Sequence, residues 1–133
     1  MNNEIFEYCK SIAQELEAIA NGEKKVCANC GCIIEEDEVT ICPECESDEL
    51  MSSNIYDYFS NTEIFDIEYT IGSNFEFRGV RLMVGCGGPN VYINTITASV
   101  ELFWWTQKAE YSLIPSVVEE IDNCWEEIYL CHK

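Results

Sequence analysis

Four cysteines in two pairs carry the clearest chemical signal in this sequence. Cys27 and Cys30 form the first C-x-x-C pair, and Cys42 and Cys45 form the second. Two residues between thiolates allow one tight turn to direct both sulfur atoms at a single ion, so two such turns supply four tetrahedral ligands. A site with four sulfur ligands leaves no position open for water. The spacing therefore predicts a Zn²⁺ ion with a structural role.

The motifs CANCG and CPEC resemble those of a zinc ribbon, and this resemblance is limited to residues 27–45. Gly31 and Pro43 suit the tight turns of such a site. Two other interpretations remain open: four buried cysteines without a metal, or an iron or iron–sulfur site, because sulfur ligands alone do not select the metal. Cys32 is an alternative ligand, although the single residue between it and Cys30 makes a poorer fit.

The remaining cysteines are expected to be core or near-core thiols, the common position of free cysteine. They are Cys9, Cys86, Cys124 and Cys131. An odd total of nine cysteines, together with metal-bound thiolates, favours a reducing compartment over a disulfide scaffold. The first ten residues carry acids where a secretory signal carries Lys or Arg, and no apolar run approaches the roughly 18 residues of a membrane span. We therefore expect a cytoplasmic location.

The pattern of apolar residues predicts an α+β fold with short connections. Residues 3–21 have apolar positions every three or four residues, which predicts an amphipathic helix that Gly22 ends. Four strands are expected at 65–71, 75–84, 91–97 and 100–108. Connections this short favour antiparallel neighbours, hence a four-stranded antiparallel meander. A helical turn at 54–60 precedes the strands, and a helix beginning at Pro115 follows them.

The expected organisation is an N-terminal helix, an inserted zinc ribbon and an α+β domain. Their predicted boundaries are 1–22, 23–50 and 51–133. Within the ribbon, residues 33–34 and 39–41 are expected to form a hairpin around an acidic turn. This unit has almost no apolar residues for a core, so a bound metal is needed to hold it together.

The charge of the chain excludes a nucleic-acid-binding module. Asp and Glu number 25 against 7 Lys and Arg, a formal net charge of −18, although 47% of the residues are hydrophobic. Such a chain repels a phosphate backbone, and it far exceeds the net charge of about 2–8 that solubility needs. We therefore expect a cationic protein partner. The predicted partner-binding residues are Glu35, Glu36, Asp37 and Glu38 in the ribbon and Glu119, Glu120 and Asp122 in the last helix.

No set of residues in the sequence points to an enzyme. The one histidine, His132, is penultimate, and no nucleophile stands beside an evident base. Residues 85–90 are rich in glycine but lack the phosphate-loop patterns, so they predict a tight turn between strands. Residues 100–105 are apolar on both faces, which is typical of an interior strand or, alternatively, of an exposed aromatic anchor.

A second resemblance is based on the segments GGPNVYI and VELFWW and on the acidic helix that follows them. Over residues 63–130 the chain resembles small uncharacterised acidic proteins of Gram-positive phages and mobile elements. This resemblance implies no catalytic residue. It implies a setting in which small acidic proteins resemble anti-restriction or anti-CRISPR inhibitors, with the zinc ribbon as an insertion.

Together these observations predict a non-enzymatic inhibitor of a host DNA-targeting defence protein, such as Cas9, that acts through a DNA-mimicking acidic surface. Three alternatives stay open. They are a zinc-ribbon adaptor that binds another protein through apolar contacts, a metal-dependent hydrolase, and a factor that binds host RNA polymerase.

Overall fold

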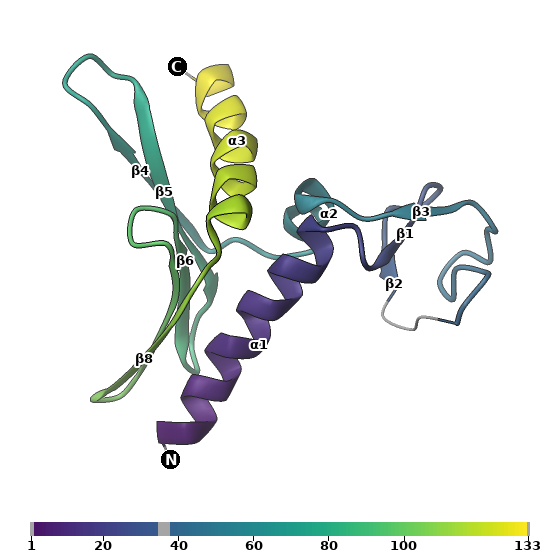
Figure 1. Ribbon diagram of the computed structural model, residues 1–133, viewed down its shortest axis with the longest axis horizontal. Coiled ribbons are helices and arrows are strands. Elements are labelled where there is room, and N and C mark those ends of the chain that lie inside the picture. The colour runs from purple at the N-terminus through teal and green to yellow at the C-terminus, as the bar shows by residue number, and fades with distance from the viewer. Residues whose placement is uncertain (1, 35–37, 133) are drawn as a thin grey trace.

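The computed structural model describes residues 2–34 and 38–132 of the chain. Figure 1 shows a large twisted sheet with two long helices along one face, and a small cysteine-rich module that projects beyond the end of the first helix. Both sheets are antiparallel. The α+β class is therefore as predicted.

The first helix, α1 (Asn2–Ala20), follows the predicted amphipathic pattern. Its apolar face buries Cys9, Leu16 and Ile19 in the main core. The helix ends at Gly22, which has a φ of 73°. The N–H of Gly22 donates to the carbonyl of Ile19, and the next N–H donates to the carbonyl of Ala18. This pair of hydrogen bonds is the Schellman motif, which needs a residue in the left-handed region.

The main sheet has five strands rather than the predicted four. Its strands, in spatial and chain order, are β4 (Asp66–Ile71), β5 (Phe77–Gly85), β6 (Asn90–Asn94), β7 (Ser99–Trp104) and β8 (Gln107–Ser112). The difference arises at residues 100–108, which the sequence predicts as one strand. Trp105 and Thr106 form a two-residue turn there, and Trp104 pairs with Gln107 across it. The apolar run at 102–105 continues into the turn, and no Gly, Asn or Asp marks it, so sequence patterns do not reveal this turn.

The other two helices also begin as the sequence predicts. Asn54 caps α2 (Ile55–Ser60), since its side chain accepts from the N–H groups of Tyr56 and Asp57. Pro115 is the first residue of α3 (Pro115–His132). None of the helices within residues 2–34 and 38–132 is long and apolar enough to cross a membrane.

The two long helices cover one face of the main sheet (Figure 1). Helix α1 lies against β7 and β8, and α3 lies against β5. Val100 and Leu102 on β7 are buried, so the interior-strand interpretation of residues 100–105 holds for this part. The opposite face is polar. There, Arg81 Nε donates to Glu101 Oε1 at 3.2 Å, and the Arg81 guanidinium lies 3.7 Å from the ring centre of Tyr92.

The cysteine module, residues 23–53, contains a second sheet in the order β2-β1-β3. The strands are β1 (Lys25–Cys27), β2 (Ile33–Ile34) and β3 (Leu50–Ser52). The predicted hairpin is therefore wrong in its partner, because β2 pairs with β1 instead of residues 39–41. The short turn within the first cysteine pair places β2 directly beside β1. Strand β3, which spans the predicted boundary at residue 50, pairs with the other edge of β1.

Candidate metal centre

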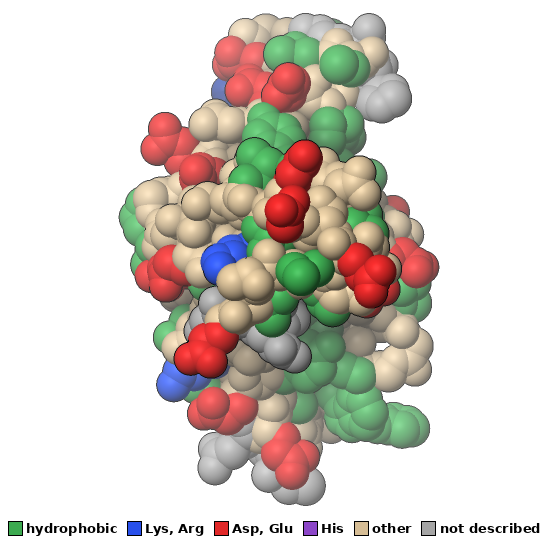
Figure 2. Space-filling view, turned by 90° about the vertical axis from the view of Figure 1, so that its right-hand side faces the viewer, with side chains coloured by type: hydrophobic (Ala, Val, Ile, Leu, Met, Phe, Trp, Pro, Cys, Tyr) green, Lys and Arg blue, Asp and Glu red, His purple; other side chains and the backbone are tan. Residues whose placement is uncertain are grey.

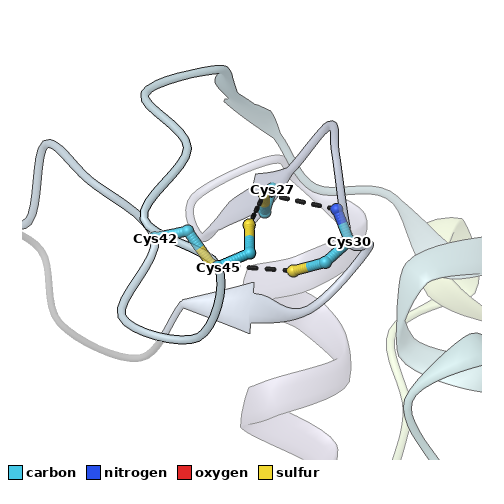
Figure 3. Close-up of side chains that lie close together, drawn as sticks. All are labelled: Cys27, Cys30, Cys42 and Cys45. Carbon is cyan, nitrogen blue, oxygen red and sulfur yellow. Dashed lines mark hydrogen bonds between the residues drawn. The ribbon is translucent and has the colours of Figure 1, made fainter.

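The four predicted cysteines meet at one point of the module. The Sγ atoms of Cys27, Cys30, Cys42 and Cys45 all lie within 4.8 Å of one another (Figure 3). Sγ of Cys27 lies 3.5 Å from Sγ of Cys45, and Sγ of Cys30 lies 3.6 Å from Sγ of Cys42. A tetrahedron with metal–sulfur bonds of about 2.3 Å has sulfur–sulfur edges of roughly 3.8 Å. The cluster therefore fits a tetrahedral metal ion, as a zinc-ribbon-like site requires.

The first cysteine turn is closed by backbone hydrogen bonds around Cys27. The Cys27 N–H donates to the carbonyl of Cys32 at 3.0 Å, and the Gly31 N–H donates to the carbonyl of Cys27 at 2.8 Å. Gly31 has a φ of 80°, a conformation that glycine adopts at no steric cost. The N–H of Cys30 points at Sγ of Cys27 at 3.4 Å. The turn thus places the Cys27 thiol beside the Cys30 N–H, a donor that favours the thiolate form of Cys27.

The second cysteine turn repeats the first with different residues. The Cys42 N–H donates to the carbonyl of Ser47, and the Glu46 N–H donates to the carbonyl of Cys42, both at 2.8 Å. Glu46 follows Cys45 as Gly31 follows Cys30, so the two residues occupy equivalent positions. Glu46 has a φ of 64°. Sequence reasoning missed this residue. The signal was its position, since glycine stands at the equivalent place in the first turn.

The hydrogen bonds of the turns divide the thiols into two kinds. The N–H of Cys30 lowers the pKa of Cys27. Burial alone would raise the pKa of Cys42, but the N–H groups of Cys45 and Glu44 outweigh it and lower this pKa to about 6. The pKa of Cys30 is raised, because hydrogen bonds to neighbouring thiols outweigh the N–H of Cys32. The turns thus favour the thiolate forms of Cys27 and Cys42, and a metal ion would displace the protons of the other thiols.

A fifth thiol, Cys32, lies beside the cluster. Its Sγ is 3.3 Å from Sγ of Cys42, and this hydrogen bond, followed by burial, raises the pKa of Cys32. It does not belong to the set of four that lies within 4.8 Å. Asn29 supplies a different contact that the sequence did not reveal: its Nδ2 donates to Sγ of Cys45 at 3.5 Å. Such outer contacts orient ligands.

Apart from its cysteines, the module has little to hold it together. Its buried cluster consists of Cys27, Ile34 and Cys42, with a few half-buried neighbours. Ile33 packs against the main core, and two side-chain hydrogen bonds also attach the module to the body of the protein. Asn61 Nδ2 donates to the carbonyl of Gly31 at 3.0 Å, and Ser53 Oγ donates to the carbonyl of Ile19 at 3.2 Å.

The other four cysteines divide evenly between core and surface. Cys9 and Cys124 are buried as predicted, and burial raises the pKa of each thiol to about 11. Cys86 and Cys131 are exposed, so the prediction of near-core positions is wrong for them. Cys86 lies in the glycine-rich turn after β5, and Cys131 lies in the last turn of α3.

The predicted partner-binding acids differ in their surroundings. Glu35, Glu36 and Asp37 lie outside the described residues. Glu38 and Glu119 are exposed, whereas Glu120 and Asp122 are half-buried. Among the described residues, the module and α3 expose seven further carboxylates. They are Glu23, Glu44, Glu46, Asp48, Glu49, Glu126 and Glu127.

Asp122 is the least available of the predicted acids that the structure describes. Its Oδ1 atom is enclosed and has no hydrogen-bond partner. Burial raises the pKa of this carboxyl, and the nearby Glu126 adds to the effect, while the Thr95 side chain opposes it. Burial of its carboxyl therefore makes the charged form of Asp122 less favourable.

Acids on the main sheet are partnered by bases. Arg81 pairs with Glu68 and Glu101, and Lys108 pairs with Glu110. By contrast, residues 26–77 contain no Lys or Arg, and neither do residues 109–132. Lys24 and Lys25 are thus the bases of the module, and neither its acids from residue 26 onward nor those of α3 have a Lys or Arg on the same segment.

No protein family, curated protein or solved structure compared with the chain matches it. The comparisons thus give no support to the resemblance of residues 63–130 to phage proteins. The site itself stands on its geometry: four thiols within 4.8 Å that fit a metal ion such as zinc.

Proposed function

We propose that this chain is a non-enzymatic protein, stabilised by Zn²⁺, that binds a cationic partner through its acidic surface. In the finer form of the proposal the partner is a nucleic-acid-binding effector, such as a host DNA-targeting defence protein of the Cas9 type. The uneven placement of charge carries this proposal. Carboxylates are paired with Arg and Lys on the main sheet, but residues 26–53 of the module and the whole of α3 carry acids and no Lys or Arg.

Zn²⁺ is the proposed metal because four thiolates in a closed site suit it and leave no position for a substrate or water. Its proposed role is to fix the second cysteine turn and the residues that follow it. Glu44, Glu46 and Asp48 are exposed there. A fixed loop presents its carboxylates in one arrangement and loses less conformational entropy on binding.

Carboxylates on a rigid scaffold reproduce part of the field of DNA. A duplex carries one negative charge per roughly 1.7 Å of its axis, and a basic cleft evolved to bind it attracts any similar array. Figure 2 shows acidic side chains spread over the face it presents, with few basic ones between them. Such a surface steers a cationic partner toward the protein and speeds association.

The experiment is a competition for a basic cleft. A purified Cas9–guide complex binds a fluorescent duplex target, and the anisotropy is followed as the metal-loaded chain is added at low and at high salt. We expect the chain to displace the duplex at low salt and to lose this effect at high salt, since ionic screening weakens exposed charge pairs. Arginines that read the short duplex motif are the natural contacts in such an effector.

Matched charge reversals decide whether the placement of the acids matters. The double variant Glu119→Lys with Glu126→Lys changes α3, and Asp66→Lys with Glu76→Lys changes the sheet by the same net charge. We expect the α3 variant to weaken competition severalfold and the sheet variant to have a small effect. Equal effects would mean that only net charge acts. If neither the chain nor its variants compete, a tagged pull-down from bacterial lysate, eluted with duplex DNA, tests other basic partners.

A second candidate function is that of an adaptor bound through apolar contacts. Ile41 and Met51 are exposed on the module, at 50% and 55% respectively. This function predicts a complex that resists salt and that Met51→Ala weakens. A complex of that kind would contradict the acidic-surface proposal.

A further inference from the structure

A groove at the far end of α1 from the cysteine module forms a second candidate binding site. It lies between the first turns of α1 and the turn from β7 to β8, and encloses about 570 Å³. Figure 1 shows these two segments at its lower edge. This volume is within the usual range of ligand pockets. Three aromatic side chains line it: Tyr8 of α1, and Trp104 and Trp105 at the end of the hairpin.

The two tryptophans sit in a way that packing alone does not explain. Trp105 is 90% exposed and has a φ of 56°, and Trp104 is 38% exposed. A bulky residue in the left-handed region is strained, and an exposed indole gains nothing from burial. A glycine in this turn would relieve the strain. Such outliers concentrate at binding sites, where strain holds a side chain ready for its ligand.

The glycine-rich turn after β5 lies beside Trp104. Pro89 also lines the groove, and a methyl group added at Gly88 would lie 3.6 Å from the Trp104 ring. The glycine-rich turn, which the sequence analysis singled out without a role, therefore passes close beside the indole. Trp104 and Trp105 therefore form the side of the groove that the hairpin contributes.

The charge of the groove selects its ligand. Glu4 is the one charged residue among the described residues that line it, and it is exposed. The positive end of the α1 dipole is worth about half a charge, so the full charge of the carboxylate outweighs it. Aromatic faces beside a carboxylate attract a cation and offer nothing to an anion. A planar guanidinium suits this arrangement best, because it stacks on indole rings and donates to a carboxylate at the same time.

We propose that this groove binds an arginine side chain presented by a protein partner. The guanidinium would stack against Trp105 and Trp104 and donate to the Glu4 carboxylate. The proposal does not rest on the acidic surface of α3 and the module, because a helix of the length of α1 separates the groove from the module. At 1.5 Å per residue, the 19 residues of α1 span about 28 Å.

The test uses the three tryptophans as separate reporters. Full-length ¹⁵N-labelled protein, loaded with its metal, is titrated with a blocked Gly-Arg-Gly peptide at millimolar concentrations. The three indole N–H signals are assigned with Trp104→Phe and Trp105→Phe. We expect saturable shifts of the Trp104 and Trp105 signals, while the signal of the buried Trp125 stays in place. The same peptide with citrulline, which has the shape of arginine without its charge, should bind about tenfold more weakly.

Two matched pairs of variants locate the contacts. Glu4→Gln should weaken binding about fivefold, and Glu7→Gln, which removes the same charge from an exposed α1 position outside the groove lining, less than twofold. Trp105→Ala should weaken it about tenfold, whereas Phe75→Ala, at the exposed turn between β4 and β5, should leave it unchanged. Equal binding of the citrulline peptide, equal effects of the two Gln variants, or shifts of Trp125 alone would overturn the proposal. So would the absence of any shift.

Discussion

The cysteine module and the body of the protein achieve a fixed structure by different means. The body buries a continuous core between its sheet and helices, with Leu16, Leu82, Ile93, Leu102 and Ile121 entirely enclosed. The module encloses little beyond Cys27, Ile34 and Cys42. Burial of apolar area stabilises the body of the protein, at about 25 cal/mol per Å². The module has too little of it and depends on four thiols that meet at one point.

The same contrast applies to charge. The body places its sheet acids beside arginines and lysines, whereas the module has a stretch from residue 26 to residue 53 without any base. Coordination to a metal can hold loops whose side chains all point outward. A region stabilised in this way is free to devote its surface to carboxylates. The comparison thus connects the means of stabilisation to the proposed acidic binding surface.

The largest effect is expected from removing a ligand of the module. Cys42→Ser takes away a buried thiol on which both cysteine turns depend. We expect loss of the bound metal and unfolding of the module, because the binding free energy of structural Zn²⁺, about 10–16 kcal/mol in small domains, is also its folding free energy. Metal content by mass spectrometry and amide NMR spectra measure this.

The control for this prediction is Cys131→Ser, which removes an exposed thiol far along α3. It should leave one metal ion per chain. Collapse of the NMR signals of the main sheet in Cys42→Ser would contradict the comparison, because it would show that the body also depends on the metal.

The reverse experiment removes packing from the body. Leu102→Ala creates a cavity in the fully buried centre of β7. It should lower the free energy of unfolding by about 2–5 kcal/mol, the usual cost of such a cavity. Urea denaturation followed by the signal of Trp125 measures it. The metal content should stay at one ion per chain, and a loss of metal would show that the two regions are not independent.

The sequence predicts most of the local structure, because its apolar pattern and caps act locally. The helices at 3–21 and from Pro115 and the cap at Gly22 are found at or near their expected positions, and the four predicted cysteines lie together. The extra strand was missed because Trp105 adopts a φ of 56° where turn patterns call for glycine or asparagine. A tryptophan in the left-handed conformation cannot be recognised from the sequence, because turn patterns depend on glycine or asparagine.

The pairing of strands within the module also could not be predicted from the sequence. Strands of two or three residues are too short for a periodic pattern, so neither β3 nor the pairing of β2 with β1 is visible from composition. The surroundings of Asp122 depend on how α3 packs near Thr95, which no local pattern reports. The acidic partner-binding residues remain a prediction.

The two cysteine turns allow a finer test of the module. They share their hydrogen bonds, but Gly31 occupies the left-handed position of one and Glu46 that of the other. Relief of strain at Glu46 should exceed the entropy that glycine adds to the unfolded chain, so we expect Glu46→Gly to stabilise the module by about 0.7 kcal/mol. This corresponds to about threefold tighter Zn²⁺ binding in a chelator competition.

Two companion variants separate conformation from charge. Glu46→Ala removes the same carboxylate but keeps the Cβ atom, so it should not reproduce the gain. Gly31→Ala introduces a Cβ at a φ of 80° and should weaken Zn²⁺ binding about fivefold. If Glu46→Ala binds Zn²⁺ as tightly as Glu46→Gly, charge and not backbone strain distinguishes the two turns.

The smallest effect concerns the half-buried Asp122. Burial, aided by Glu126, raises its pKa above the ordinary value of 3.8. A carboxyl of this kind favours the folded state fully below pH 3.8, and this contribution is lost as the pH rises through the folded-state pKa. Asp122→Asn should therefore stabilise the protein near neutral pH by about 1 kcal/mol, since an amide needs no charge at the enclosed position. The gain should shrink toward zero in acid.

Thermal unfolding of variant and wild type, compared at each pH, measures this gain, because loss of the metal in acid affects both proteins alike. Glu119→Gln, an exposed change of equal charge on the same helix, is the matched control. Its effect should stay within about 0.5 kcal/mol at every pH. A gain that is equal for both variants would mean that the repulsion among the acids of α3 is collective. In that case Asp122 would belong with the exposed carboxylates available to a cationic partner, and the distinction between enclosed and available acids on α3 would fail.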